Sequence, residues 1–163
     1  MFYIQLIGVL AFLIYVLSFY RKTPKMILIY QIVGNFAYAM HYFLLGALSG
    51  AFINFVGMFR NISLMNVKKF KNIIGIVVVL LYLLITIIFF EGVYSVLPLV
   101  ANSQYVFAIL NGTRKNLLVG GIIGSLLWIL YATCVNSYSG VVTESILVIS
   151  NTVQLLRLSK KSR

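Results

Sequence analysis

The sequence contains very little negative charge and few residues of the kinds that form catalytic or metal-binding sites. Its 163 residues include two acidic side chains, Glu91 and Glu144, against 13 lysines and arginines. The single histidine cannot form a histidine-rich metal site, and the single cysteine, Cys134, excludes a disulfide within the chain. There is also no Ser–His–Asp set, no pair of catalytic carboxylates and no phosphate-binding loop. We therefore expect no enzymatic activity, no cofactor and no bound metal.

The composition is that of a membrane protein. Hydrophobic residues make up 62% of the chain and charged residues 9%, whereas about a quarter of the residues in a soluble domain are charged. In a soluble protein the net charge of +11 would suggest a nucleic-acid partner. Here the placement of the charges between apolar segments instead predicts the lipid bilayer as a partner, and no nucleic acid.

Seven apolar stretches are long enough to cross a bilayer as α-helices, since a helix rises about 1.5 Å per residue and the hydrocarbon is about 30 Å thick. The first is too long for the apolar region of a signal peptide and has no basic residue before it, so we expect it to be retained. The short connections predict one compact all-α bundle without a soluble domain. The predicted spans are Phe2–Tyr20, Met26–Leu45, Ala47–Val67, Asn72–Phe90, Gly92–Leu110, Asn116–Val135 and Ser139–Leu158.

The basic residues predict the orientation of these spans. Twelve of the 13 would lie on one side of a seven-span protein, and the thirteenth, Arg60, lies within the third span. The other side carries Glu91 and no lysine or arginine. Because positively charged loops stay in the cytoplasm, the N-terminus is predicted outside and the C-terminus inside. The twelve residues are Arg21, Lys22, Lys25, Lys68, Lys69, Lys71, Arg114, Lys115, Arg157, Lys160, Lys161 and Arg163.

The chain also predicts an internal repeat. Residues 23–71 align with residues 113–161 at a shift of 90 positions, with nine identities in 49 positions. Identity alone is weak evidence in so apolar a chain, but the spans and the charges agree at the same shift. We expect two parallel three-helix units, residues 1–67 and residues 92–163 with their basic cytoplasmic tail, joined by a linker helix in residues 68–91.

Polar side chains within the spans predict where a binding site would lie, because such groups are costly in hydrocarbon and usually face the interior of a bundle. Tyr38 and Trp128 are equivalent in the repeat and lie about ten residues from the cytoplasmic loops, too deep for an interfacial aromatic belt. Asn54 and Glu144 are equivalent at the same shift. The predicted substrate-binding residues are Tyr38, Asn54, Asn102, Trp128 and Glu144.

Glu144 is the most informative of these residues. A carboxylate within a span must be protonated, hydrated or paired with a cation. The candidate charge partner is Arg60, although its side chain could instead extend to cytoplasmic lipid phosphates. The single histidine, His41, is expected at the rim near the outer end of the second span rather than as a ligand.

Four further residues are candidates for gating or hinge roles. Asn61 and Asn151 are equivalent in the repeat and either pack between helices or act as gates. Pro98 is expected to bend the fifth span, because proline removes a backbone hydrogen bond within a helix. Its repeat partner Gly8 is also a weak point in a helix, so a hinge in both units is expected.

Four short stretches carry a resemblance to a known family: residues 8–14, residues 41–46, Val96-Leu97-Pro98, and residues 139–151. They resemble the YgjV family of bacterial inner-membrane proteins, which is grouped with the SWEET and PQ-loop (MtN3-like) transporters. The resemblance implies a multi-pass protein of the bacterial cytoplasmic membrane. SWEET-like proteins place an aromatic residue on spans 2 and 6 and an asparagine on spans 3 and 7 around a sugar. By this resemblance the places fall to Tyr38, Trp128, Asn54 and Glu144.

Two functions remain open at this point. The first is a small-solute transporter that works by alternating access, with a sugar, an amino acid or another metabolite bound between the two three-helix units. The second is a non-transporting membrane subunit or sensor, which predicts dry, tight packing around Asn54 and Glu144 and no central pocket. The solute, the coupling ion and a homo-oligomeric state are left open by the sequence.

Overall fold

A computed structural model describes residues 2–19, 24–66, 70–111 and 113–161. These residues form helices and no strand, which confirms the all-α prediction. Five of the basic residues used to predict the orientation, namely Arg21, Lys22, Lys68, Lys69 and Arg163, lie outside the described residues. The helices are α1 (Phe2–Phe19), α2 (Pro24–Leu44), α3 (Leu48–Asn66), α4 (Lys71–Ile88), the 3₁₀ helix η1 (Val93–Ser95), α5 (Val96–Asn111), α6 (Arg114–Cys134) and α7 (Tyr138–Lys161).

Each α-helix coincides with one of the predicted spans to within a few residues. Four stretches of the described chain are long and apolar enough to cross a membrane: α4, residues 93–110, α6 and residues 138–160. A shorter apolar helix of the described chain, Phe2–Tyr15, lies within α1. The structure is therefore that of a helical protein in which four of the described segments are long and apolar enough to cross a membrane.

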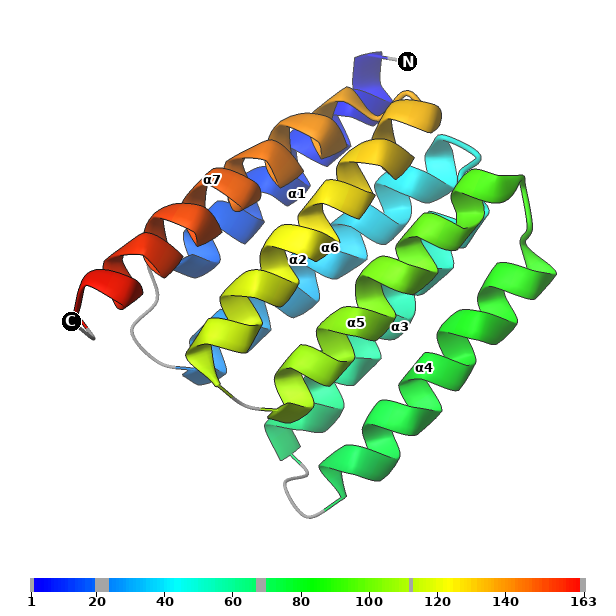
Figure 1. The fold of residues 1–163 in the computed structure, drawn as a ribbon. Coiled ribbons are helices and arrows are strands. Elements are labelled where there is room, and N and C mark those ends of the chain that lie inside the picture. The colour runs from blue at the N-terminus through cyan, green and yellow to red at the C-terminus, as the bar shows by residue number, and fades with distance from the viewer. Residues whose placement is uncertain (1, 20–23, 67–69, 112, 162–163) are drawn as a thin grey trace.

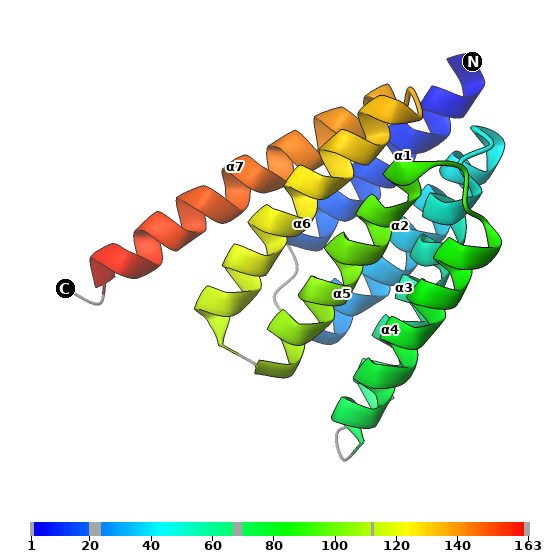
Figure 2. The same ribbon diagram turned by 45° about the vertical axis from the view of Figure 1, so that its right-hand side comes forward.

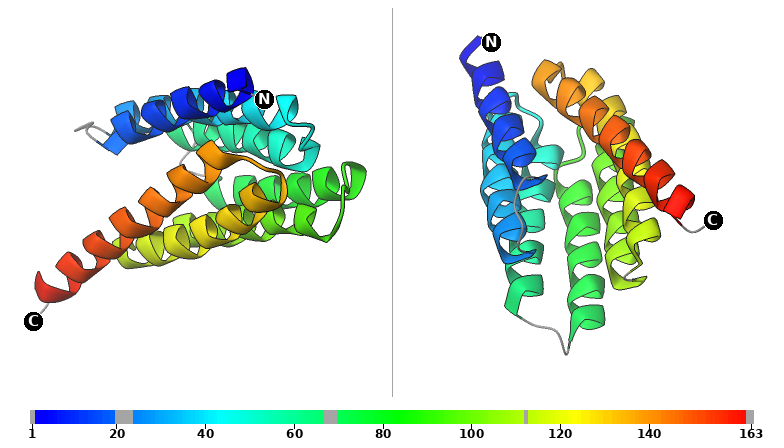
Figure 3. Two further views of the ribbon diagram at one scale, coloured as in Figure 1. Left: turned by 90° about the horizontal axis from the view of Figure 1, so that it is seen from above. Right: turned by 90° about the vertical axis from the view of Figure 1, so that its left-hand side faces the viewer.

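The helices form two layers. One layer contains α1, α2 and α3 with α2 in the middle, and the other contains α5, α6 and α7 with α6 in the middle (Figures 1 and 3). The layers meet along their edges, where α1 packs on α7 and α3 packs on α5. From the end of the bundle that holds the N-terminus, α7 diverges from α1 (Figure 3). The fourth helix lies alongside α3 and α5, outside the two layers (Figure 2).

The turns between α2 and α3 and between α6 and α7 have the same hydrogen bonds at a shift of 90 residues. In the first turn, the amide of Ala47 donates to the carbonyl of Tyr42 at 2.9 Å, and in the second that of Ser137 donates to Ala132 at 2.8 Å. The residue before each donor has a positive φ, +78° at Gly46 and +57° at Asn136. This is the Schellman helix end, which favours glycine or asparagine at that position.

Pro98 does not bend the interior of the fifth span, contrary to the prediction. The helix α5 begins at Val96 and is preceded by the short 3₁₀ helix η1, so Pro98 lies in the first turn of α5. The first backbone N–H groups of a helix have no partner within that helix, so proline is tolerated there. The prediction began the span at Gly92, and the break at η1 separates Pro98 from that earlier segment.

The helix α4 is apolar on every side and is buried along one narrow stripe. That stripe comprises Gly75, Val78, Tyr82 and Thr86, at the spacing of successive helical turns. Large apolar side chains elsewhere on α4, such as Ile76, Leu80 and Ile87, are exposed in the monomer. So extensive an apolar surface is stable against lipid rather than water.

The basic residues whose side chains are described lie at one end of the bundle, apart from Arg60. Lys71 begins α4, Arg114 begins α6, and Arg157 and Lys160 lie near the end of α7 (Figure 1). Glu91 lies at the opposite end, between α4 and η1. The charge asymmetry expected from the sequence is thus present along the bundle axis among the described residues.

Candidate functional site

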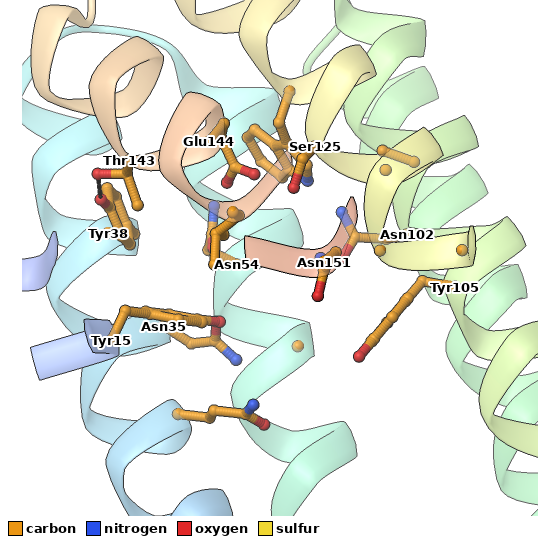
Figure 4. Close-up of a pocket in the computed structure, with 18 of the residues that line it drawn as sticks. Tyr15, Asn35, Tyr38, Asn54, Asn102, Tyr105, Ser125, Thr143, Glu144 and Asn151 are labelled. Atoms are coloured by element: carbon orange, nitrogen blue, oxygen red, sulfur yellow. Dashed lines mark hydrogen bonds between the residues drawn. The ribbon is translucent and has the colours of Figure 1, made fainter. Parts of the chain in front are cut away.

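A cavity of about 160 Å³ lies between the two layers (Figure 4). Its wall contains side chains from α1, α2, α3, α5, α6 and α7, whereas α4 contributes none. The wall is rich in amide, hydroxyl and aromatic groups, and it includes one carboxyl group and one guanidinium group. All five residues predicted to bind a substrate lie on it, namely Tyr38, Asn54, Asn102, Trp128 and Glu144.

Asn54 and Asn102 on the cavity wall each donate a hydrogen bond within their own helix. The Nδ2 of Asn54 donates to the backbone carbonyl of Gly50 at 2.9 Å, and that of Asn102 donates to the carbonyl of Pro98, also at 2.9 Å. A carbonyl oxygen can only accept a hydrogen bond, so these contacts fix the orientation of each amide. Each Oδ1 therefore remains as an acceptor for a molecule in the cavity.

Glu144 lies on the cavity wall beside Ser125, its neighbour across the interface between α7 and α6 (Figure 4). Among the described residues, no basic side chain lies within ion-pairing distance of its carboxyl group, so Arg60 is not its partner in this structure. The preceding residue, Thr143, joins α7 to α2, since its hydroxyl and that of Tyr38 are 2.5 Å apart. Glu144 thus extends from a helix that is anchored to the opposite layer.

Arg60 also lies on the cavity wall but bonds elsewhere. Its Nε and Nη2 both donate to Oδ1 of the adjacent Asn61, each at 3.1 Å, and its guanidinium carbon lies 5.7 Å from the centre of the Tyr105 ring. The remaining nitrogen, Nη1, is buried without a hydrogen-bond partner. Arg60 has an exposed fraction of 8%, so its side chain does not extend to the surface, as it would have to do in order to reach cytoplasmic lipid phosphates.

An aromatic cluster lies at the interface of α2 and α6. The rings of Tyr42, Trp128 and Tyr131 lie 5.5–5.6 Å apart between centroids, and the ring of Tyr38 stacks on Tyr42 at 6.2 Å. Tyr38, Tyr42 and Trp128 also line the cavity. Aromatic pairs at these distances stabilise each other beyond the burial of their area.

Hydrogen bonds between the two layers close the end of the bundle at which α3 and α7 begin. His41 of α2 contacts the α6–α7 turn, with its Nε2 2.7 Å from the hydroxyl of Ser137. Tyr131 of α6 contacts the start of α3, where its hydroxyl accepts from the amide of Gly50 at 2.9 Å. His41 has an exposed fraction of 0%, so the prediction that it lies at the rim was wrong.

Two further side chains add hydrogen bonds at this closed end. Glu91 contacts the beginning of α3, and Gln5 contacts the beginning of α7. The Oε1 of Glu91 accepts from the amide of Leu48 at 2.6 Å, at the beginning of α3. The Oε1 of Gln5 accepts from the amide of Ser139 at 3.3 Å, at the beginning of α7. The first amides of a helix have no partner within it, so both side chains satisfy groups that would otherwise be unpaired.

The four predicted gating or hinge residues lie in four different settings. Asn151 lines the cavity, whereas Asn61 lies behind it and accepts from Arg60. Gly8 is at the closed end, where an added Cβ would fall 1.9 Å from the Ser139 hydroxyl oxygen. The close approach of α1 and α7 therefore explains why this position is a glycine. Pro98 is buried at the start of α5.

Several residues on the cavity wall were not identified as site residues from the sequence. Three that carry a hydroxyl group are Tyr15, Tyr105 and Thr143. The hydroxyl of Tyr15 donates to Oδ1 of Asn35 at 2.5 Å, which links α1 to α2. Tyrosine is common in apolar segments, so neither Tyr15 nor Tyr105 stands out from the sequence. Thr143 directly precedes Glu144 in the sequence, and this adjacency is the one feature that could have indicated a place near the site.

Comparison with known proteins identifies the family of the chain. No curated protein and no solved structure matches it. The family model Imp-YgjV, described as a bacterial inner membrane protein, matches residues 2–162. This match covers nearly the whole sequence and agrees with the apolar helices of the structure. The chain therefore belongs to the Imp-YgjV family of bacterial inner membrane proteins.

Proposed function

We propose that this protein is a small-solute transporter that works by alternating access, with the solute bound in the cavity between the two layers. The observation that carries the proposal is the polar cavity itself. Polar side chains are retained in the interior of a membrane bundle where they line a pathway or bind a ligand. Tyr38 and Trp128 would contact the solute through their rings, and Asn54, Asn102 and Glu144 would accept its hydrogen bonds.

In this proposal, the protein consists of two parallel three-helix units joined by α4, as in SWEET-like transporters. The identical hydrogen bonds in the α2–α3 and α6–α7 turns support the repeat. The packing also supports the repeat. In the two units α1 corresponds to α5 and α3 corresponds to α7, so the contact between α1 and α7 is equivalent to the contact between α5 and α3. The role of α4 as a linker is supported by its absence from the cavity wall. The N-terminus is proposed to lie outside and the C-terminus in the cytoplasm.

The alternative function, a subunit or sensor without transport, predicts dry packing around Asn54 and Glu144. The cavity beside both residues favours transport over this alternative. At about 10–15 Å³ for each water-sized probe, a cavity of about 160 Å³ holds on the order of ten water molecules. That volume suits a small metabolite, whether a sugar, an amino acid or another compound.

Solute uptake into proteoliposomes tests the proposal directly. Purified protein is reconstituted and screened against a panel of labelled sugars, amino acids and organic ions, with protein-free liposomes as the blank. Glu144→Gln and Trp128→Ala are expected to lower uptake at least ten-fold. Phe107→Ala is the matched aromatic control, because Phe107 is exposed on α5 and does not line the cavity. Uptake that is unchanged in both cavity variants would exclude this site.

A further inference from the structure

One acidic and one basic side chain on the cavity wall have no ionic partner among the described residues. One is the carboxyl group of Glu144 on α7, and the other is the guanidinium group of Arg60 on α3. Glu91 is the only other acidic side chain in the sequence, and it caps α3 at the closed end. A buried charge is stable when it is paired and hydrogen-bonded, so both groups lack part of the environment that they require.

Hydrogen-bond donors without partners gather on the Arg60 side of the cavity. Nη1 of Arg60 and Nδ2 of Asn35 are both buried without a hydrogen-bond partner, and both residues line the cavity. Asn35 approaches α3 about one helical turn before Arg60, since a Cβ at Gly57 would be 3.4 Å from Nδ2 of Asn35 and Arg60 follows Gly57 by three positions. Donors of this kind bind a carboxylate or a similar anionic group.

Hydrogen-bond acceptors gather on the Glu144 side. Oδ1 of Asn54 and Oδ1 of Asn102 remain available because the Nδ2 of each donates within its own helix. Together with the carboxyl group of Glu144, they form a set of acceptors on three different helices. The rings of Tyr42 and Trp128 line the same cavity. Carboxylate and amide oxygens beside aromatic faces bind ammonium groups.

Solute classes differ in whether they can pair with Glu144, with Arg60 or with both. A neutral sugar would leave both charges without an ionic partner. An organic cation would leave Arg60 unpaired, and an anion would leave Glu144 unpaired. A solute that carries an ammonium group and a carboxylate pairs with both.

We propose that the solute is a zwitterion whose ammonium group binds Glu144, Asn54 and Asn102 and whose carboxylate binds Arg60 and Asn35. This inference rests on the proposed function, because it names the solute class for the same cavity. Arg60 lies six positions beyond the residue that is equivalent to Glu144 in the repeat, which corresponds to about 9 Å along the helix axes. The separation of the two charges in the solute is therefore the variable that the experiment must scan.

Ligand binding to the purified, folded protein tests the class of solute separately from transport. The probes are α-alanine, 4-aminobutanoate and 6-aminohexanoate, each with a matched amine, a matched carboxylate and glucose as neutral control. Affinity is measured by isothermal calorimetry and by thermal stabilisation, since a ligand that binds only the folded state raises its melting temperature. The expected result is at least ten-fold tighter binding of one amino acid than of its matched amine and carboxylate.

Two variants make the test specific for charge. In Glu144→Gln the preferred amino acid is expected to bind at least ten-fold more weakly, while the matched carboxylate binds as it does to the wild type. In Arg60→Gln the loss falls on the carboxylate, and the matched amine binds as before. Circular dichroism checks that each variant is folded. If Arg60→Gln does not fold, the wild-type panel and Glu144→Gln decide the question.

The outcomes separate this inference from the proposed function. Binding of glucose without binding of any amino acid would overturn the zwitterion and leave transport intact. Binding of an amino acid that is never taken up by proteoliposomes would support the zwitterion and contradict transport. Equal affinity for an amino acid and its matched amine, or no binding by any probe, would overturn the inference.

Discussion

His41 and Tyr131 are 90 positions apart in the chain, and each contacts the turn that follows the other. His41 approaches Ser137 and Ser139 at 2.7 and 3.3 Å, and the hydroxyl of Tyr131 lies 3.1 Å from that of Ser49. Ser49 and Ser139 are themselves equivalent at the same shift. Each layer thus holds the beginning of the other layer's third helix, and the contacts are reciprocal although the two side chains differ chemically.

Removal of the Tyr131 hydroxyl is expected to destabilise this closed end. In Tyr131→Phe, the amide of Gly50 and the hydroxyl of Ser49 lose a buried partner, which costs roughly 1–3 kcal/mol. The melting temperature of the purified protein should fall accordingly. Tyr3→Phe is the control, because Tyr3 is exposed near the N-terminus. Equal melting temperatures for the two variants would show that these hydrogen bonds do not hold the layers together.

Close packing of α1 against α7 predicts a large difference between two glycine-to-alanine variants. In Gly8→Ala the new Cβ would lie 1.9 Å from the hydroxyl oxygen of Ser139, so the helices must separate, at a cost of roughly 1–3 kcal/mol. In Gly57→Ala the nearest atom is 3.4 Å away, and no such cost is expected. Thermal unfolding of both variants in the same detergent measures the difference. A Gly8→Ala protein as stable as Gly57→Ala would contradict the packing.

The left-handed residue of the α6–α7 turn provides a third test. Asn136 has a φ of +57°, so Asn136→Gly should keep the wild-type melting temperature or raise it. Asn136→Val should lower the stability by about 1–2 kcal/mol, because a β-branched side chain is strained in this conformation. Retained stability in Asn136→Val would mean that the turn has another conformation.

The proposed orientation can be checked with the native cysteine. Cys134 is exposed at the end of α6 that is predicted to lie outside. A membrane-impermeant maleimide should therefore label it in intact spheroplasts. Ser159→Cys, in a Cys134→Ser background, should be labelled only after the membrane is opened, because Ser159 lies near the end of α7 that carries Arg157 and Lys160. The reverse pattern would invert the topology.

Much of the fold could be predicted from the sequence, because hydrophobic length and basic loops reflect the bilayer directly. The seven helices were predicted to within a few residues, but the start of α5 was not. Hydropathy does not distinguish the 3₁₀ turn at Val93–Ser95 from the helix that follows, so Pro98 was misinterpreted as a kink. The five polar or aromatic residues predicted from the spans do line the cavity, but Tyr15, Tyr105 and Thr143 on the same wall were not predicted.

The contacts of the site could not be predicted in the same way. The sequence shows that Arg60 and Glu144 are both within spans, but not how their side chains are oriented, and the candidate ion pair between them is absent from the described structure. His41 was misjudged because its partners Ser137 and Ser139 lie on another layer, nearly 100 positions away. Contacts between distant segments depend on how the layers meet, and local sequence patterns carry no information about that.

Access to the cavity from both sides of the membrane tests the central proposal most directly. Asn54→Cys, in a Cys134→Ser background, places one thiol on the cavity wall. A small, charged thiol reagent is applied to oriented vesicles from one side and then, in a separate sample, from the other. Alternating access predicts reaction from both sides and protection by a bound solute. Reaction from one side only, or from neither, would contradict it.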